Sequence, residues 1–166
     1  MTGTPILDEV RVLAESCSSV RPRGRTKLTG ALAIEVMRRH LHEAGIPVSA
    51  RDVFLRGNPT EFDTLVVRAS ARPLCGIIYD PGDVAAILEI KYSGIYSQDV
   101  PTALRKSFQT VKAHHPHIQC VYLTVCENPR FRFRITTATL GIPAFTLYWV
   151  NPQRTIAEPG DALQSV

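Results

Sequence analysis

The sequence lacks the segments that would place it in several large classes of protein. No stretch of its 166 residues approaches the ~18 consecutive apolar residues of a membrane-spanning helix. The first fifteen residues do not combine a basic start with an apolar run, as a secretory signal does. Because apolar residues make up 45% and charged residues 20% of the chain, a disordered or fibrous protein is excluded. We therefore expect a cytoplasmic globular protein without membrane association.

Several chemical signatures are missing as well. The four cysteines form no CxxC pair, so we expect reduced thiols rather than disulfides. The histidines at 114, 115 and 117, near Cys120, have no second pair of ligands that would complete a zinc site. There is no GxxxxGK[ST] loop and no GxSxG elbow, which leaves P-loop nucleotide hydrolysis and serine-triad chemistry unsupported.

Positive charge is in mild excess and is unevenly distributed. The chain has 19 Lys and Arg against 15 Asp and Glu, a formal net charge of +4. Seven of the basic residues fall in two short segments: Arg21, Arg23, Arg25 and Lys27 in the first, and Arg130, Arg132 and Arg134 in the second. Such segments can neutralise phosphates, but they are also typical of solvated basic loops. Charge alone therefore leaves nucleic-acid binding open.

Apolar periodicity predicts three helices. The first runs from Pro5 to the serines at 16–19, and the second covers residues 28–44 before Gly45. A basic loop at residues 20–27 is expected between them. The third helix is capped by Asp99 and extends to residues 112–114.

Runs of β-branched and apolar residues predict the strands. The strong candidates are residues 61–69, 84–91, 118–125 and 144–150, with a weak one at 51–56 and a short extra one at 76–79. A fourth helix is favoured between residues 128 and 141, with a strand at 130–136 as the alternative. The polar tail from Asn151 is expected to pack loosely.

This order of elements predicts an α/β fold with a central mixed sheet of four to five strands, flanked by helices on both faces. We expect one domain over residues 1–166. It would comprise an N-terminal helix and basic loop (1–27), a core (28–150) and the tail (151–166).

Three charged residues stand out in the predicted strands. Asp63 interrupts an apolar strand, while Glu89 and Lys91 end the most hydrophobic one. Buried charges are costly unless they are paired or coordinate a ligand. Residues two apart on a strand share a face, so an antiparallel neighbour could bring Asp63 beside Glu89 and Lys91. Two carboxylates near a backbone carbonyl form the hard oxygen site that Mg²⁺ or Mn²⁺ prefers. The alternative is a structural Glu–Lys pair with Asp63 closing a turn.

The segments Glu61-Phe62-Asp63 and Ile87-Leu88-Glu89-Ile90-Lys91, in this order of elements, resemble the PD-(D/E)XK or restriction-endonuclease-like nuclease superfamily. The resemblance covers residues 28–150 and implies an αβββαβ core. It also implies that Asp63 and Glu89 bind Mg²⁺ and that Lys91 assists the attacking water. The carbonyl of Ile90 is the expected third protein ligand. The chain departs from the family pattern at Phe62, which stands where the motif has proline.

Members of this superfamily often carry accessory residues near the site. The candidates here are Glu35 on the helix before the sheet, Glu61 beside Asp63, and Lys106 and Gln109 on the helix that follows Lys91. Glu35 is also placed to pair with Arg38 or Arg39 on the helix surface. Lys106 and Gln109 are equally typical of a solvated helix face.

These residues lead to three hypotheses. The first is a Mg²⁺-dependent (or Mn²⁺-dependent) endonuclease of DNA, with RNA not excluded, whose two basic segments follow the nucleic-acid backbone. Such a nuclease could act as a homodimer or within a larger nucleoprotein assembly. The second is a catalytically inactive protein of the same fold that binds nucleic acid or a protein partner. The third is an interaction domain without a role in nucleic-acid binding.

Overall fold

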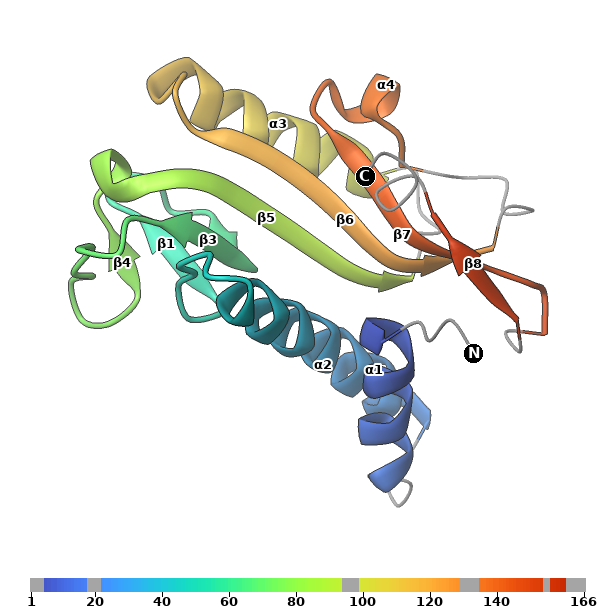
Figure 1. Ribbon diagram of the computed structural model, residues 1–166. Coiled ribbons are helices and arrows are strands. Elements are labelled where there is room, and N and C mark those ends of the chain that lie inside the picture. Colours follow the sequence, from blue (N-terminus) through green and yellow to red (C-terminus); the bar gives the residue numbers. More distant parts are fainter. Residues whose placement is uncertain (1–4, 18–21, 94–98, 129–134, 154–155, 161–166) are drawn as a thin grey trace.

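A computed structural model describes residues 5–17, 22–93, 99–128, 135–153 and 156–160. These residues form two β-sheets with helices on both sides of the larger one (Figure 1). Across the described residues, none of the helices has the length and apolar character that crossing a bilayer requires.

The larger sheet has five strands in the order β3-β5-β6-β7-β8. The strands are β3 (Thr64–Val67), β5 (Val84–Ser93), β6 (Gln119–Glu127), β7 (Ala144–Val150) and β8 (Ala157–Pro159). The three long central strands run parallel, while β3 and β8 are antiparallel to their neighbours. The sheet is therefore mixed, and the predicted fold class is confirmed.

The smaller sheet has three short strands in the order β2-β1-β4. They are β1 (Val53–Leu55), β2 (Glu61–Phe62) and β4 (Ile78–Tyr79), with β1 antiparallel to β2 and parallel to β4. Between β2 and β3 the chain passes from the smaller sheet to the larger one, and Asp63 is the residue at this crossing.

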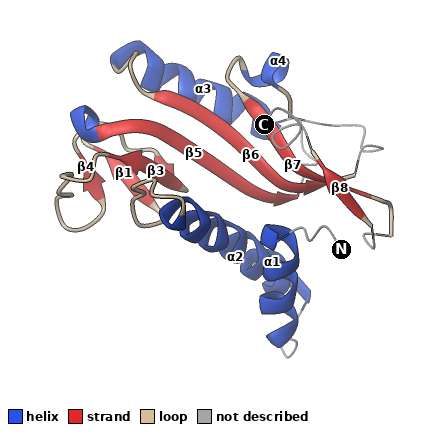
Figure 2. Ribbon diagram, in the orientation of Figure 1, coloured by secondary structure: helices blue, strands red, loops and turns tan. Residues whose placement is uncertain are grey.

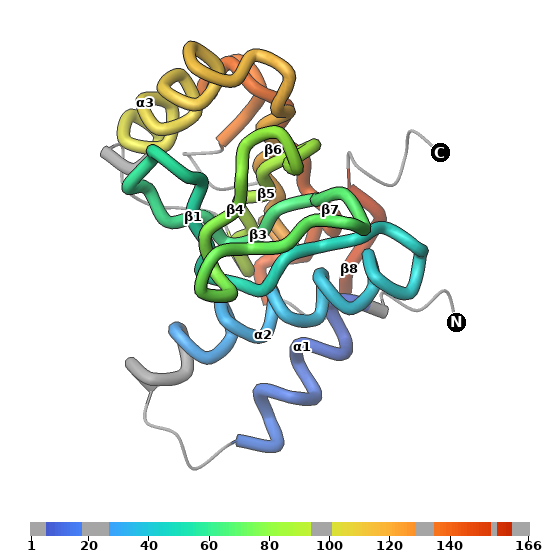
Figure 3. Tube along the Cα trace, turned by 90° about the vertical axis from the view of Figure 1, so that its left-hand side faces the viewer, coloured from blue at the N-terminus to red at the C-terminus, as the bar shows by residue number. Residues whose placement is uncertain are grey.

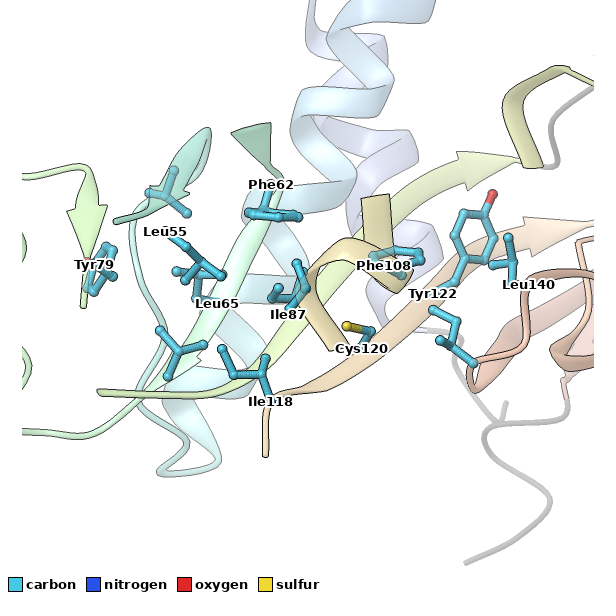
Figure 4. Packing of buried hydrophobic residues seen from close by; sticks show 14 residues of the cluster. Leu55, Phe62, Leu65, Tyr79, Ile87, Phe108, Ile118, Cys120, Tyr122 and Leu140 are labelled. Carbon is cyan, nitrogen blue, oxygen red and sulfur yellow. The ribbon is translucent and has the colours of Figure 1, made fainter. Parts of the chain in front are cut away.

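The helices cover opposite faces of the larger sheet (Figure 2). The helices α1 (Pro5–Ser16) and α2 (Pro22–Glu43) lie on one face, and α3 (Asp99–His114) and α4 (Thr137–Leu140) lie on the other. Each face has its own apolar core. The core beneath α3 also includes the smaller sheet, through residues such as Leu55, Phe62 and Tyr79 (Figure 4).

Strand β5 contributes to both cores because its side chains alternate. Ile87 packs into the core beneath α3, whereas Leu88 and Ile90 pack against α1 and α2. The same alternation places Glu89 and Lys91 on the α3 face of the strand. The long apolar run that predicted a strand buried on both sides is confirmed.

Two sequence-based boundaries were wrong. The basic loop expected at residues 20–27 is largely helical, because α2 begins at Pro22, and proline is well suited to the first position of a helix. The strand expected at residues 61–69 is divided at Asp63 into β2 and β3. Of the helix expected between residues 128 and 141, the described residues contain α4, and residues 129–134 lie outside the described part of the chain.

The described part of the tail packs more closely than expected. Its strand β8 pairs with β7, and the N–H of Gly160 donates to the carbonyl of Leu147 at 2.7 Å. A Cβ on Gly160 would lie 2.2 Å from the carbonyl oxygen of Thr146, so only glycine allows this close approach. The described end of the chain is thereby held against the sheet.

Candidate active site

The crossing between the two sheets positions Asp63. In the antiparallel pair of β3 and β5, Thr64 lies opposite Leu88 and Leu65 opposite Ile87, so the next position along places Asp63 beside Glu89. The chain leaves the larger sheet at this point. The Asp63 carboxylate therefore takes the place of a ladder partner and accepts a hydrogen bond from the N–H of Ile90 at 2.7 Å.

Lys91 joins the two carboxylates. Its Nζ lies 2.6 Å from Oε1 of Glu89 and 3.1 Å from Oδ2 of Asp63. The three side chains are largely but not fully buried, with exposed fractions of 31% for Lys91, 16% for Asp63 and 12% for Glu89. The structure thus brings together the three residues that the sequence singled out, and solvent can still reach them.

The charges of this group act strongly on one another. Burial and the neighbouring charge of Asp63 raise the pKa of Glu89 above its usual value, although Lys91 opposes this shift. Burial lowers the pKa of Lys91, but the carboxylates of Glu89 and Asp63 outweigh burial and raise it overall. The site therefore holds a fixed ammonium beside a carboxylate whose ionised form is disfavoured. Such opposing environments are a feature of functional sites.

The backbone of Ile90 faces the same place as the two carboxylates. Within a strand, the N–H and C=O of one residue point toward the same neighbour. Because the N–H of Ile90 is bonded to Asp63, its carbonyl is directed toward the Asp63 side of β5. A carbonyl and two carboxylates make a donor set of hard oxygen atoms that fits Mg²⁺ or Mn²⁺.

A pocket of about 270 Å³ opens beside Glu89, between the segment 60–62 and α3. We refer to it as the Glu89 pocket, and it is lined by Thr60, Glu61, Phe62, Glu89, Ala103, Leu104, Ser107 and Phe108. Glu61 is close enough for its charge to contribute to the raised pKa of Glu89. The pocket provides space next to the candidate metal ligands.

Ser107 is a lining residue that the sequence reasoning missed. Its Oγ is buried and has no hydrogen-bond partner among the described residues. Buried hydroxyl groups are usually hydrogen-bonded, so one left without a partner at a pocket wall suggests an external partner such as water or a ligand. No sequence signal marks this serine, because only the packing of α3 against residues 60–62 places it there.

The other accessory candidates lie elsewhere. Glu35 is exposed on α2 and forms an ion pair with Arg38, as the surface alternative predicted. Lys106 and Gln109 are exposed on α3, and neither lines the Glu89 pocket. The structure thus places Glu61 near Glu89 but places the other three away from the pocket.

Little of the predicted basic surface falls within the described residues. Arg21, Arg130, Arg132 and Arg134 lie outside them, and Arg23 and Arg25 are described only as part of the α2 backbone. Lys27 is an exposed residue of α2. In the described part of the chain, no group of three or more histidine, cysteine, aspartate or glutamate side chains is arranged to hold a metal ion. A metal at this site would therefore rest on two carboxylates, the carbonyl and additional oxygen atoms from water or substrate.

Comparisons with known proteins bear on the fold. No family model and no curated protein matches the chain. Among solved structures, the chain is similar to the cAAA-bound form of NucC from P. aeruginosa, with a TM-score of 0.59 and 11% identity over 98% of this chain and 85% of that one. It is also similar to the cAAA-bound form of NucC from E. coli, with a TM-score of 0.57 and 14% identity over 93% and 79% of the two chains.

The chain has the fold of NucC. NucC is a nuclease of the PD-(D/E)XK-like type, so the fold implied by the sequence resemblance is confirmed. At 11–14% identity this similarity is evidence for the fold only. The roles of the individual site residues depend on the geometry described above.

Proposed function

We propose that this protein is a Mg²⁺-dependent endonuclease that hydrolyses phosphodiester bonds in DNA. The observation that carries the proposal is the bridging of Asp63 and Glu89 by Lys91 at a solvent-accessible strand end, beside a pocket. Two carboxylates and a lysine at the end of a central strand are the residues that the PD-(D/E)XK resemblance predicts for the site.

In this proposal Asp63, Glu89 and the carbonyl of Ile90 hold the metal. When bound, Mg²⁺ polarises the phosphate and lowers the pKa of a coordinated water. The cleaved bond joins phosphorus to the oxygen of the leaving sugar, and the attacking water supplies the new oxygen. The chain's own residues must orient this water and stabilise the charge that develops on the phosphate oxygens.

Lys91 is suited to both tasks. An ammonium group has three N–H donors, and two of them reach Glu89 and Asp63 in the described structure. The third remains for a water molecule or a phosphate oxygen. Because the two carboxylates raise the pKa of Lys91, the group stays charged at neutral pH and acts as a donor and point charge rather than as a base.

A cleavage assay on a panel of substrates tests the proposal. Supercoiled plasmid, single strands, branched DNA and RNA are incubated with Mg²⁺, Mn²⁺ or EDTA. Because the two NucC structures named above are cAAA-bound forms, each reaction is run with and without cAAA. We expect metal-dependent cutting of DNA by the wild type and a loss of at least about 100-fold in Lys91→Ala.

The control variant is Arg51→Ala, which removes an exposed basic residue that is ion-paired with Asp52 and lies outside the site. Cutting that persists in Lys91→Ala, or that needs no divalent metal, would contradict the assignment. A second candidate function follows from the same ion pairs. If Lys91 and the two carboxylates are purely structural, the wild type will bind nucleic acid in EDTA but cut none of the substrates.

A further inference from the structure

A second pocket lies farther along α3. It has a volume of about 300 Å³ and is lined by the turn after β1 (Arg56, Gly57, Asn58 and Pro59) and by Thr110, His114 and His115 at the C-terminal end of α3. We refer to it as the Arg56 pocket. No sequence motif marks this pocket, because its two halves are about fifty residues apart in the chain.

The Arg56 pocket and the Glu89 pocket lie between the same two segments. Residues 56–59 and the C-terminal half of α3 line the first, while residues 60–62 and the preceding turns of α3 line the second. Figure 3 shows the segment after β1 beside α3. The distance along the helix from Ser107 to His114 is about 10 Å at 1.5 Å per residue. Each nucleotide of a duplex strand rises about 3.4 Å along the helix axis and its phosphates are farther apart than this rise, so the two pockets are separated by no more than about three nucleotides.

The charges of the two pockets are opposite. Glu61 and Glu89 line the Glu89 pocket, whereas the titratable residues that line the Arg56 pocket are Arg56, His114 and His115. The acid that pairs with Arg56 is Asp80, whose carboxylate lies 3.3 Å from Nη1 of the arginine. Both side chains of this pair are more than half exposed, so exchanging Asp80 for another anion has a small free-energy cost.

The hydrogen-bond donors of the Arg56 pocket are also suited to an anion. The Nδ1 of His114 donates to the carbonyl of Thr110 at 2.9 Å, so the Nε2 of the neutral ring is an acceptor and the anion's donors must come from other residues of the pocket. The Oδ1 of Asn58 accepts from the N–H of Thr60 at 2.9 Å, so its amide NH₂ is the part that can donate. Gly57 has a positive φ of 81° and an open approach to its backbone.

We propose that the Arg56 pocket binds a backbone phosphate of the DNA strand whose cleavage takes place at the Glu89 end. This inference rests on the proposed nuclease function for the identity of the strand. Arg56 supplies the fixed positive charge, the amide of Asn58 supplies a donor, and the spacing along α3 places the bound phosphate no more than about three nucleotides from the one that is cut.

Binding of a fluorescent DNA duplex in EDTA, over a series of salt concentrations, tests the pocket without requiring catalysis. We expect Arg56→Gln to weaken binding about fivefold and to reduce the slope of log K against log salt by about 0.9, the value for one phosphate contact. Asp80→Asn should tighten binding, because it releases Arg56 and keeps an oxygen that can accept from the N–H of Gly82.

The matched control is Arg51→Gln, which also removes an exposed arginine paired with an aspartate but lines neither pocket. Equal binding by Arg56→Gln and Arg51→Gln, or a wild type that binds no DNA, would overturn the proposed phosphate site. Failure of the nuclease proposal gives a different pattern, in which the wild type cuts nothing but Arg56→Gln still loses affinity relative to Arg51→Gln.

Discussion

The two faces of strand β5 differ sharply in chemistry although they share one backbone. Leu88 and Ile90 continue an apolar core beneath α1 and α2. On the opposite face, Ile87 belongs to the core beneath α3, but the next two positions are Glu89 and Lys91. The first face is apolar at both positions, whereas the second changes from an apolar core at Ile87 to a charged site at Glu89.

This difference shows that the α3 face of β5 contributes less to the free energy of unfolding than the α2 face does. Burying a side chain such as Leu88 is favourable by about 1.5–3 kcal/mol, whereas burying a charge is costly unless a partner compensates. Lys91 compensates part of the cost for Glu89 and Asp63, but the pKa of Glu89 remains raised. The α3 face of β5 thus carries an electrostatic cost, whereas its α2 face contributes favourable apolar burial.

The largest expected effects come from truncating one side chain on each face of β5. Leu88→Ala should lower the free energy of unfolding by about 2–5 kcal/mol, because it leaves a cavity in the core beneath α1 and α2. Its cleavage activity per folded molecule should stay near that of the wild type. Lys91→Ala should do the reverse, losing at least about 100-fold in cleavage with a smaller loss of stability. Chemical denaturation and plasmid cleavage measure the two quantities.

Leu88→Met is the control for this pair, because a volume-conserving change in a core costs less than about 1.5 kcal/mol. The comparison fails if Leu88→Ala and Lys91→Ala lose stability and activity in the same proportion. In that case the two faces would not be separable into a supporting face and a functional one.

Divalent metal should stabilise the protein through the charged face alone. At about 100 times its dissociation constant, a ligand that binds only the folded state adds about 2.7 kcal/mol to the free energy of unfolding. We expect Mg²⁺ or Mn²⁺ to raise the melting temperature of the wild type. Asp63→Ala should abolish this increase, since it removes one of two carboxylates that form the candidate site. Differential scanning fluorimetry with and without EDTA provides the measurement.

Glu35→Ala is the matched control for the metal experiment, because Glu35 is an exposed acid on the α2 side that pairs with Arg38. It should keep the full metal-induced increase. If metal still raises the melting temperature of Asp63→Ala, the metal does not bind at the proposed site.

A smaller effect is expected from Glu89→Gln in the absence of metal. Since the pKa of Glu89 is raised in the folded state, folding favours its protonated form, and stability is lost as the pH rises through the unfolded and then the folded pKa. The glutamine side chain cannot ionise, so the variant should be the more stable protein at about pH 7–8 in EDTA and should lose this advantage below the usual carboxylate pKa of 4.5. Melting temperatures measured from about pH 4 to 8 test the sign, and a constant difference across this range would contradict it.

Much of this arrangement could be predicted from the sequence. The bounds of β7 and the extent of α3 match the expected ones, because strand and helix periodicities are long and clear in these segments. The chain just before β3, the antiparallel neighbour of β5, brings Asp63 beside Glu89 and Lys91, as the alternation of side chains along the strands predicted. The catalytic roles of these residues stay predictions.

The remainder depends on contacts between distant segments. The start of α2 was missed because its Pro22 and nearby glycine are typical of loops, although proline is compatible with the first turn of a helix. Ser107 and Arg56 gave no signal, since each acquires its setting only when α3 packs beside residues 56–62. A small polar residue on a helix is uninformative until its neighbours are known.

The smallest expected effect concerns two serines that differ in their hydrogen bonds. Ser49 is buried, and its hydroxyl contacts the carbonyl of Ala50, the hydroxyl of Thr64 and the N–H of Leu65. The Oγ of Ser107 has no partner among the described residues. Ser49→Ala should therefore cost about 1–3 kcal/mol by leaving buried groups unsatisfied, whereas Ser107→Ala should change stability by less than about 1 kcal/mol or increase it.

Cleavage activity shows whether the unpartnered hydroxyl of Ser107 serves the site or is incidental. If its hydroxyl holds water or substrate in the Glu89 pocket, Ser107→Ala will lower the cleavage rate severalfold while the protein stays as stable as the wild type, and Ser107→Thr, which keeps the hydroxyl, will recover part of that rate. Unchanged cleavage in Ser107→Ala would show that the hydroxyl does not serve the site. The α3 face would then owe its function to the three charged residues, and the unpartnered serine would be an imperfection of packing that the fold tolerates.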